Sequence, residues 1–135
     1  MGTESALAFE KLGCRVVHEK LIVTKAGSVL WDPVTILKRV IEDKPDLFFT
    51  VNVFGLDPAG DLLRALSLLK IKSALWFIDN PFYYHDHLMA MKSLPNVHSF
   101  VWDRFYLQPM SAFGIPHVHH LPQATNPDRF FERAL

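Results

Sequence analysis

Runs of apolar residues alternate along the chain with stretches in which apolar and polar positions recur at helical spacing. Four segments are apolar enough to be buried strands: "DLFFTVNVF" (46–54), "SALWFID" (73–79), "VHSFVWD" (97–103) and "HVHHLP" (117–122). They end at intervals of about 25 residues, close to the length of one βα repeat. Strands this apolar, separated by helices, indicate a parallel sheet covered on both faces. The pattern therefore predicts an α/β fold.

The stretches between these strands predict helices, and several carry start and stop residues. Asp-Pro begins two of them, since aspartate caps free amides and proline suits the first turn. The expected helices cover residues 5–13 (ended by Gly13), 32–43, 57–70, 82–94 and 104–114 (kinked by Pro109), and another begins at Asn126. "RVVHEKLIV" (15–23) predicts one more strand.

The first element is unusual for this fold class. A doubly wound domain normally begins with a strand in the middle of its sheet, whereas this chain opens on a helix. We expect one Rossmann-like three-layer domain over residues 1–135, with a mainly parallel sheet of about five strands that lacks the usual first strand. Residues 126–135 would begin an interdomain linker or helix. The missing strand would leave an apolar edge or face uncovered, which predicts a homo-oligomer.

Composition excludes several classes of partner. The 14 basic residues equal the 14 acidic ones and form no run, whereas nucleic-acid binding needs a concentrated positive surface. No apolar run approaches the roughly 20 residues that cross a bilayer, and the N-terminus has no signal-peptide core. Cys14 is the single cysteine, so no disulfide can form within the chain. We expect a cytoplasmic protein with no membrane span and no nucleic-acid partner.

Polar side chains follow the predicted strands where each one ends. In open parallel α/β sheets, ligands bind outside the carboxyl ends of the strands. Carboxylates and amides on one rim suit a polyhydroxylated ligand such as a sugar, and the chain has no glycine-rich phosphate motif. The residues at these ends are Asn52, Asp57, Asp79, Asn80, Asp103, Arg104, Gln123, Thr125 and Asn126.

Helix capping is the alternative role for several of these residues. Asp57, Asn80 and Asn126 each precede a proline, the pattern of a cap followed by the first helical position. If Asn80 caps, the carboxylate of Asp79 has no structural duty and is free to accept a proton from a bound hydroxyl. Asp79 is therefore the candidate general base. The aromatic residues at 82–84 can stack on a sugar face, although covering the sheet is the commoner role.

The histidines suggest a different alternative, a small metal-binding protein. His117 and His119 share a strand face, with His120 adjacent. His85 and His87 lie two apart on a predicted helix and point in different directions. No further ligand has a convincing spacing, so we expect no metal site.

Four motifs in order resemble a family of bacterial enzymes. They are "FGLDPAGDL" (54–62), "ALWFIDNPFY" (74–83), "VWDRFY" (101–106) and "LPQATNPDRF" (121–130). Together they are similar to the CgeB-like, spore-maturation type of glycosyltransferase. The segment 100–130 looks like the last βαβ unit of the N-terminal domain in enzymes of the GT-B architecture.

The resemblance implies the acceptor-side half of an enzyme that transfers a sugar from a nucleotide-sugar donor. The donor would bind a missing C-terminal domain, so no cofactor is expected in this domain and the fragment alone would be inactive. Asp79 would act as general base or orient the sugar or glycan acceptor. The cleft residues carried over are Asn52, Asn80, Asp103, Arg104, Tyr106 and Asn126. The rival interpretation is a non-enzymatic flavodoxin-like binding or signalling module.

Overall fold

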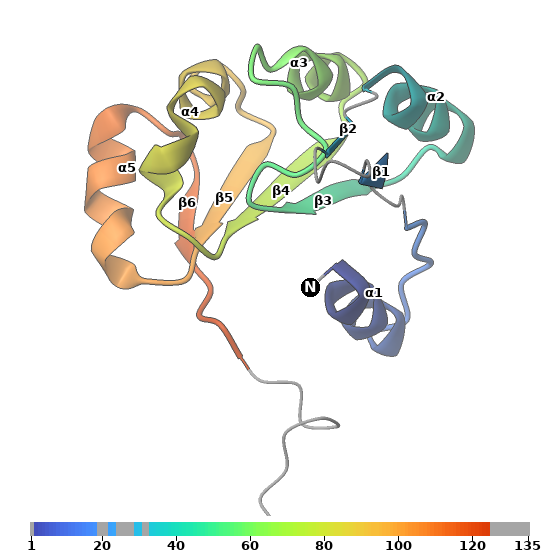
Figure 1. Cartoon of the computed structure of the whole chain (residues 1–135), viewed down its shortest axis with the longest axis horizontal. Helices are drawn as coiled ribbons and strands as arrows, with labels where there is room; N and C mark the ends of the chain where they lie inside the picture. Colours follow the sequence, from blue (N-terminus) through green and yellow to red (C-terminus); the bar gives the residue numbers. More distant parts are fainter. Residues whose placement is uncertain (1, 19–21, 24–28, 31–32, 125–135) are drawn as a thin grey trace, which may run out of the picture.

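A parallel sheet forms the middle layer of the molecule, with helices on both faces (Figure 1). The structure, a computed structural model, describes residues 2–18, 22–23, 29–30 and 33–124 of the chain. The sheet strands are β3 (Leu47–Val51), β4 (Lys72–Phe77), β5 (Val97–Val101) and β6 (Val118–His120). The α-helices are α1 (Gly2–Lys11), α2 (Pro33–Asp43), α3 (Asp61–Leu68), α4 (His85–Met91) and α5 (Leu107–Phe113). The predicted α/β fold with a parallel sheet is confirmed.

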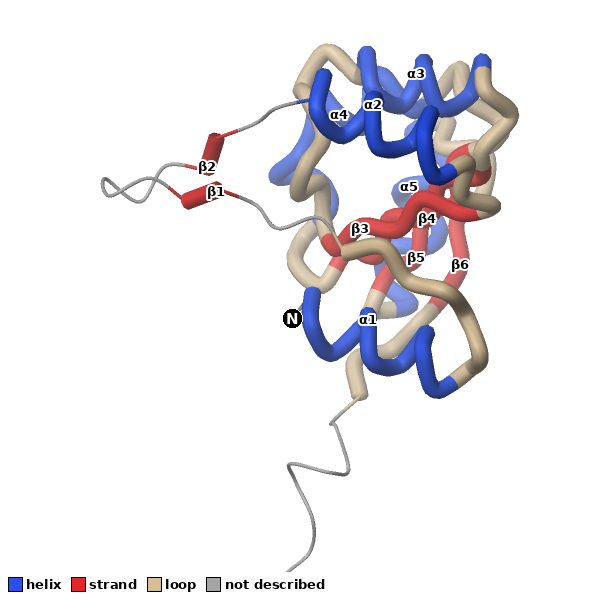
Figure 2. Tube along the Cα trace, turned by 90° about the vertical axis from the view of Figure 1, so that its right-hand side faces the viewer, coloured by secondary structure: helices blue, strands red, loops and turns tan. Residues whose placement is uncertain are grey.

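The order of the strands decides where the helices lie. The order β3-β4-β5-β6 follows the chain without reversal, and every neighbouring pair is parallel. Because βαβ crossovers are almost always right-handed, an order that never reverses places all connecting helices on one face. Figures 1 and 2 show α2 to α5 on one side of the sheet, and α1 on the other side. The parallel sheet has four strands in the described residues, rather than about five.

The prediction of one strand over residues 15–23 is wrong for residues 15–18, the first part of this segment that the structure describes. Residues 15–18 form no strand. Arg15 is instead held beside the end of α2, where its Nη2 donates to the Asp43 carbonyl at 3.2 Å. The extended part is β1 (Ile22–Val23), which pairs antiparallel with β2 (Val29–Leu30) and not with β3. Within the described ranges β3 therefore has β4 as its only strand partner, and association through its open edge stays a prediction.

The α1 helix covers one part of its face of the sheet. The ring of Phe9 in this helix packs edge-on against Phe49 of β3, with the ring centroids 5.1 Å apart. Gly13, with φ 84°, ends the helical segment as predicted, since glycine tolerates the left-handed region. Figure 1 shows α1 beneath β3, so that the same face of β5 and β6 is left without a described helix.

The main hydrophobic core lies between the sheet and the layer of α2 to α5. Alternate residues of β4 and β5 face this layer, so that Leu75, Phe77, Val97 and Val101 are fully buried. The opposing side chains, also fully buried, are Leu63, Leu66, Leu88, Met91 and Met110. Burial of each such side chain contributes about 1.5–3 kcal/mol, which fixes the strands and therefore the positions of their carboxyl ends.

Helix starts at the carboxyl edge are capped by the residues that precede the predicted helices. Asn80 Oδ1 accepts from Phe82 N at 3.0 Å and begins the 3-10 turn η1 (Pro81–Tyr84), which leads into α4. Asp103 Oδ1 accepts from Phe105 N at 2.9 Å and begins η2 (Arg104–Tyr106), which leads into α5. The predicted capping role of Asn80 is confirmed, and the predicted single helices 82–94 and 104–114 each consist of a 3-10 turn followed by an α-helix.

The side chain of Asp57 caps the start of α3, although Asp57 lies three residues before Gly60, the residue that directly precedes this helix. Its carboxylate accepts from Asp61 N at 2.7 Å and from Leu62 N at 2.9 Å. Partial burial opposes ionisation, but hydrogen bonds from the backbone amides of this turn outweigh it and lower the pKa of Asp57.

Replacing Asp57 with alanine is expected to lower the free energy of unfolding by about 1 kcal/mol, as loss of a helix cap does. Because the folded pKa is depressed, the charge-dependent part of this stability is present above the unfolded pKa of about 3.9 and is lost as the pH falls through the folded pKa. Urea unfolding of wild type and Asp57→Ala between pH 7 and pH 3 tests this. The matched control Asp57→Asn keeps an uncharged acceptor, so its difference from Asp57→Ala should not change with pH. A pH-independent wild-type advantage over both variants would contradict the role of the charge.

None of the described helices is long and apolar enough to cross a membrane. The helix predicted from Asn126 lies outside the described residues, as does the prediction for 126–135.

Candidate functional site

The carboxyl ends of β3 and β4 are joined by one side chain, that of Asn52. This residue follows β3 in the left-handed conformation, with φ 53°, and is 2% exposed. Asparagine tolerates this region better than most residues, so the chain can turn here while the amide points back across the sheet. Asn52 Oδ1 accepts from Ile78 N at 3.0 Å, and Asn52 Nδ2 donates to Asp79 Oδ2 at 2.9 Å.

Asp79 is therefore fixed at one oxygen and open at the other. Its residue is exposed, and no hydrogen bond joins Asp79 Oδ1 to another residue in the described part of the chain. The predicted neighbourhood of Asp79 and Asn52 at the strand ends is confirmed, although Asp79 does have a structural partner, which the sequence did not predict. An oriented, solvent-accessible carboxylate of this kind can accept a hydrogen bond or a proton from a bound hydroxyl.

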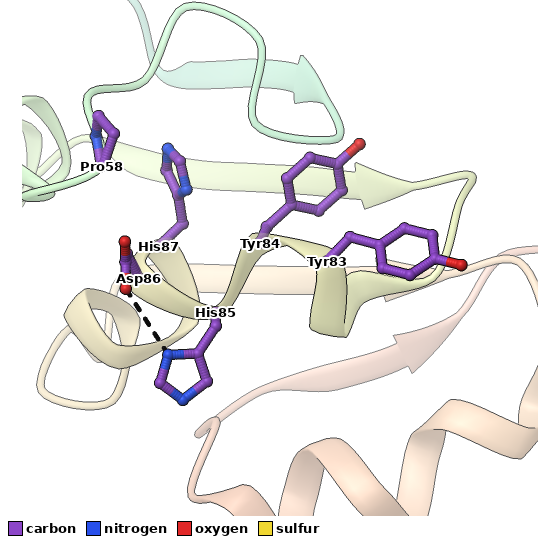
Figure 3. Close-up of a pocket in the computed structure, with 6 residues that line it drawn as sticks. All are labelled: Pro58, Tyr83, Tyr84, His85, Asp86 and His87. Atoms are coloured by element: carbon purple, nitrogen blue, oxygen red, sulfur yellow. Dashed lines mark ion pairs between the residues drawn. The ribbon is translucent and has the colours of Figure 1, made fainter.

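Tyr84 adds a hydroxyl group near this carboxylate. Burial of the ring raises the pKa of Tyr84, and the negative charge of Asp79 raises it further. Its phenol is therefore protonated at neutral pH and available as a hydrogen-bond donor. Figure 3 shows the ring of Tyr83 directed toward the loop that follows β4 and the ring of Tyr84 directed toward the loop that follows β3. Of the aromatic residues at 82–84, Phe82 and Tyr84 pack against the core as cover for the sheet, and Tyr83 is 78% exposed.

The chain after β6 returns to the end of β4. Trp76 Nε1 donates to the Leu121 carbonyl at 2.9 Å, and Gln123 Nε2 donates to the Ile78 carbonyl at 2.9 Å. These two bonds bring Gln123 beside the residue that precedes Asp79. The rim thus contains a carboxylate, two amides and a phenol: Asp79, Asn52, Gln123 and Tyr84.

The remaining predicted cleft residues have other partners. Asn80 and Asp103 are helix caps. Arg104 Nε donates to His120 Nδ1 at 3.4 Å, and Tyr106 packs against the core and the ring of Phe105. No hydrogen bond among the described residues joins Asp103, Arg104 or Tyr106 to Asp79, and Asn126 lies outside the described ranges.

A pocket of about 210 Å³ opens beside this rim at the start of α4 (Figure 3). It is lined by Pro58, Tyr83, Tyr84, His85, Asp86 and His87. The two imidazoles point in different directions, as predicted from their spacing: His85 pairs with Asp86, and the buried His87 lies 3.4 Å from the Leu56 carbonyl. Because these groups do not converge, the pocket supplies a polar wall beside the rim rather than a separate cluster of reactive groups.

The histidine trio of the metal-protein alternative is not formed. His120 lies on the opposite face of β6 from His117 and His119 and contacts Arg104. Within the described residues, no group of three or more His, Cys, Asp or Glu is arranged to hold a metal ion. His98 on β5 was not among the histidines predicted from the sequence to lie here, and its ring stacks on His117 with the centroids 4.5 Å apart. Burial, followed by the charges of His117, His119 and Lys72, lowers the pKa of His98.

Comparisons of the chain with protein-family models, with curated proteins and with solved structures found no match. The groups of the rim are hydrogen-bonding and carry one negative charge, which suits a neutral polyhydroxylated ligand better than a phosphate.

Proposed function

We propose that this chain is the Rossmann-like, acceptor-side domain of a bacterial glycosyltransferase of the GT-B architecture. The observation that carries the proposal is the Asp79 carboxylate, held at one oxygen by Asn52 and exposed at the other, at the carboxyl edge of a parallel sheet. That edge is where open α/β sheets bind their ligands. The resemblance of residues 46–131 to CgeB-like enzymes supports the same role.

Each rim residue has a different role in binding the sugar acceptor. Asp79 Oδ1 accepts the hydrogen of the acceptor hydroxyl and takes its proton as the oxygen attacks the anomeric carbon of the donor sugar. The bond from that carbon to the diphosphate oxygen breaks at the same time, and the nucleoside diphosphate leaves with the bonding electrons. Asn52 holds Oδ2 so that the free oxygen keeps its direction. Tyr84, which stays protonated, donates to a neighbouring oxygen of the acceptor.

The nucleotide-sugar donor is assigned to a further domain. The rim carries a carboxylate, and a diphosphate placed beside it would be repelled. The sequence also has no glycine-rich phosphate loop. This domain consequently contributes the acceptor hydroxyl and its base.

Titration of ¹⁵N-labelled protein with sugars tests the assignment. Simple glycosides are expected to shift the side-chain amide signals of Asn52 and Gln123, and UDP-, GDP- and TDP-sugars should not saturate below roughly millimolar concentrations. Asp79→Asn should weaken the glycoside shifts. Asp46→Asn should not, because Asp46 is exposed and precedes β3 at the opposite edge of the sheet. Micromolar nucleotide-sugar binding would place the donor site here instead. If none of the sugars shifts these amide signals, the result would favour the non-enzymatic flavodoxin-like module.

A further inference from the structure

Three imidazole rings lie side by side on the sheet face that carries α1. The register pairs Ser99 with Val118 and Phe100 with His119. Because side chains alternate along a strand, His98 of β5 shares this face with His117 and His119 of the β6 segment. The rings of His98 and His119 are nearly parallel, at 16°, and Phe100 packs against His119 at 5.1 Å.

Two nitrogens of this cluster are hydrogen-bonded to each other at a distance that also suits two ligands of one metal ion. His98 Nδ1 lies 3.3 Å from His119 Nε2. Two imidazole ligands on one tetrahedral ion, each bound at about 2.0–2.1 Å, have their nitrogens ~3.3 Å apart. His119 is exposed and His98 is partly exposed, so an ion can reach both nitrogens without opening the core.

We propose that His98 Nδ1 and His119 Nε2 bind one borderline divalent cation, Zn²⁺ or Cu²⁺, whose remaining positions are filled by water. Without the ion, one ring donates its N–H to the other, as the contact between the two nitrogens indicates. Ligation requires a lone pair on both nitrogens, so the donating ring moves its proton to its other nitrogen. No proton is released by two neutral imidazoles, and no side chain has to leave the core.

The neighbouring rings hold this pair in place. His117 stacks on His98 at 4.5 Å and 13°, and the ring of Phe100 packs against His119 with the ring centroids 5.1 Å apart. These contacts restrict the ring orientations before the ion arrives, which reduces the ordering required on binding. His117 is therefore assigned a positioning role and not a ligand role.

The ligand set also selects the type of ion. Imidazole nitrogen suits Zn²⁺ and Cu²⁺, whereas Mg²⁺ and Ca²⁺ require oxygen ligands. The order of affinities of the divalent first-row transition metals predicts that Cu²⁺ binds more tightly than Zn²⁺. A saturable response to Zn²⁺ and Cu²⁺, with none to Mg²⁺, is the expected pattern.

Calorimetric titration of the full chain without a histidine tag tests the proposal. Zn²⁺ should bind with one ion per chain, and His119→Ala should lower the affinity by at least about 10-fold, since loss of even an outer partner of a metal ligand has that effect. His120→Ala is the matched control, because it lies on the same strand but faces the other side. It should leave Zn²⁺ affinity unchanged.

A second measurement identifies the nitrogens and does not depend on variants. The ¹⁵N imidazole signals of His98 and His119 should show Zn²⁺ at Nδ1 of the first ring and at Nε2 of the second. Absence of saturable Zn²⁺ binding to the wild type overturns the proposal. So does an equal loss of affinity in His119→Ala and His120→Ala, or a Zn²⁺ response of the ¹⁵N signals that excludes His98.

Discussion

Replacing Asp79 with asparagine is expected to lower the turnover of the proposed glycosyltransferase by about 100-fold, as removal of a general base does. The substitution keeps the shape of the side chain, and the new amide oxygen can still accept from Asn52 Nδ2. The fold and the position of the strand ends should therefore be preserved. What is lost is the ability of the second oxygen to take a proton from the acceptor hydroxyl.

The measurement is steady-state kinetics of this domain joined to the proposed donor-binding domain, with kcat and KM determined separately for the acceptor. A base acts on the chemical step, so the loss should fall on kcat and leave acceptor KM within a few-fold. Asp46→Asn is the matched control, because Asp46 is exposed and precedes β3 at the opposite, amino edge of the sheet. Unchanged kcat in Asp79→Asn, or an equal loss in Asp46→Asn, would remove Asp79 from catalysis.

The parts of the fold that were predicted correctly are those encoded by local pattern. The apolar runs at 73–79 and 97–103 become β4 and β5, whose side chains facing the helix layer are fully buried. Asn80 was predicted to cap because asparagine followed by proline is compatible with little else at a helix start. These features depend on a few neighbouring residues, so no tertiary information is needed.

The sequence predicts where the candidate site residues lie, but not the hydrogen bonds between them. The rule that strands end at one edge placed Asn52 near Asp79. Their hydrogen bond depends on the left-handed backbone of Asn52, which no periodicity encodes. His98 was missed for a related reason: its contact with His119 exists because of the register between β5 and β6, a property of two distant segments.

The strand predicted over 15–23 shows the opposite case, in which tertiary contacts override a local pattern. "RVVHEKLIV" has the β-branched composition of a strand. Its first residue is nonetheless held by Asp43 at the end of α2, and Val17 remains 44% exposed. Composition indicated what the segment could form, but not whether a partner strand would be within reach.

Replacing Gly60 with alanine is expected to lower the free energy of unfolding by about 2–5 kcal/mol. Gly60 precedes α3 with φ 78°, a left-handed conformation that costs a residue with a Cβ roughly 1–2 kcal/mol. A Cβ at Gly60 would also lie 2.4 Å from Ala90 Cβ on α4, too close for two carbon atoms. Relieving such overpacking between two helices costs about 1–3 kcal/mol.

Urea unfolding of three variants separates these two causes. Gly13→Ala is the control for backbone strain alone, because Gly13 has φ 84° and nothing lies within 4 Å of its would-be Cβ. Its loss should be about 1–2 kcal/mol, smaller than that of Gly60→Ala. Adding Ala90→Gly to Gly60→Ala removes the clashing methyl group, and should recover part of the loss even though glycine within a helix costs about 1 kcal/mol. Equal losses in Gly13→Ala and Gly60→Ala, with no recovery in the double variant, would mean that α3 and α4 can separate freely. In that case the close approach of Gly60 to Ala90 would not hold the start of α3 against α4.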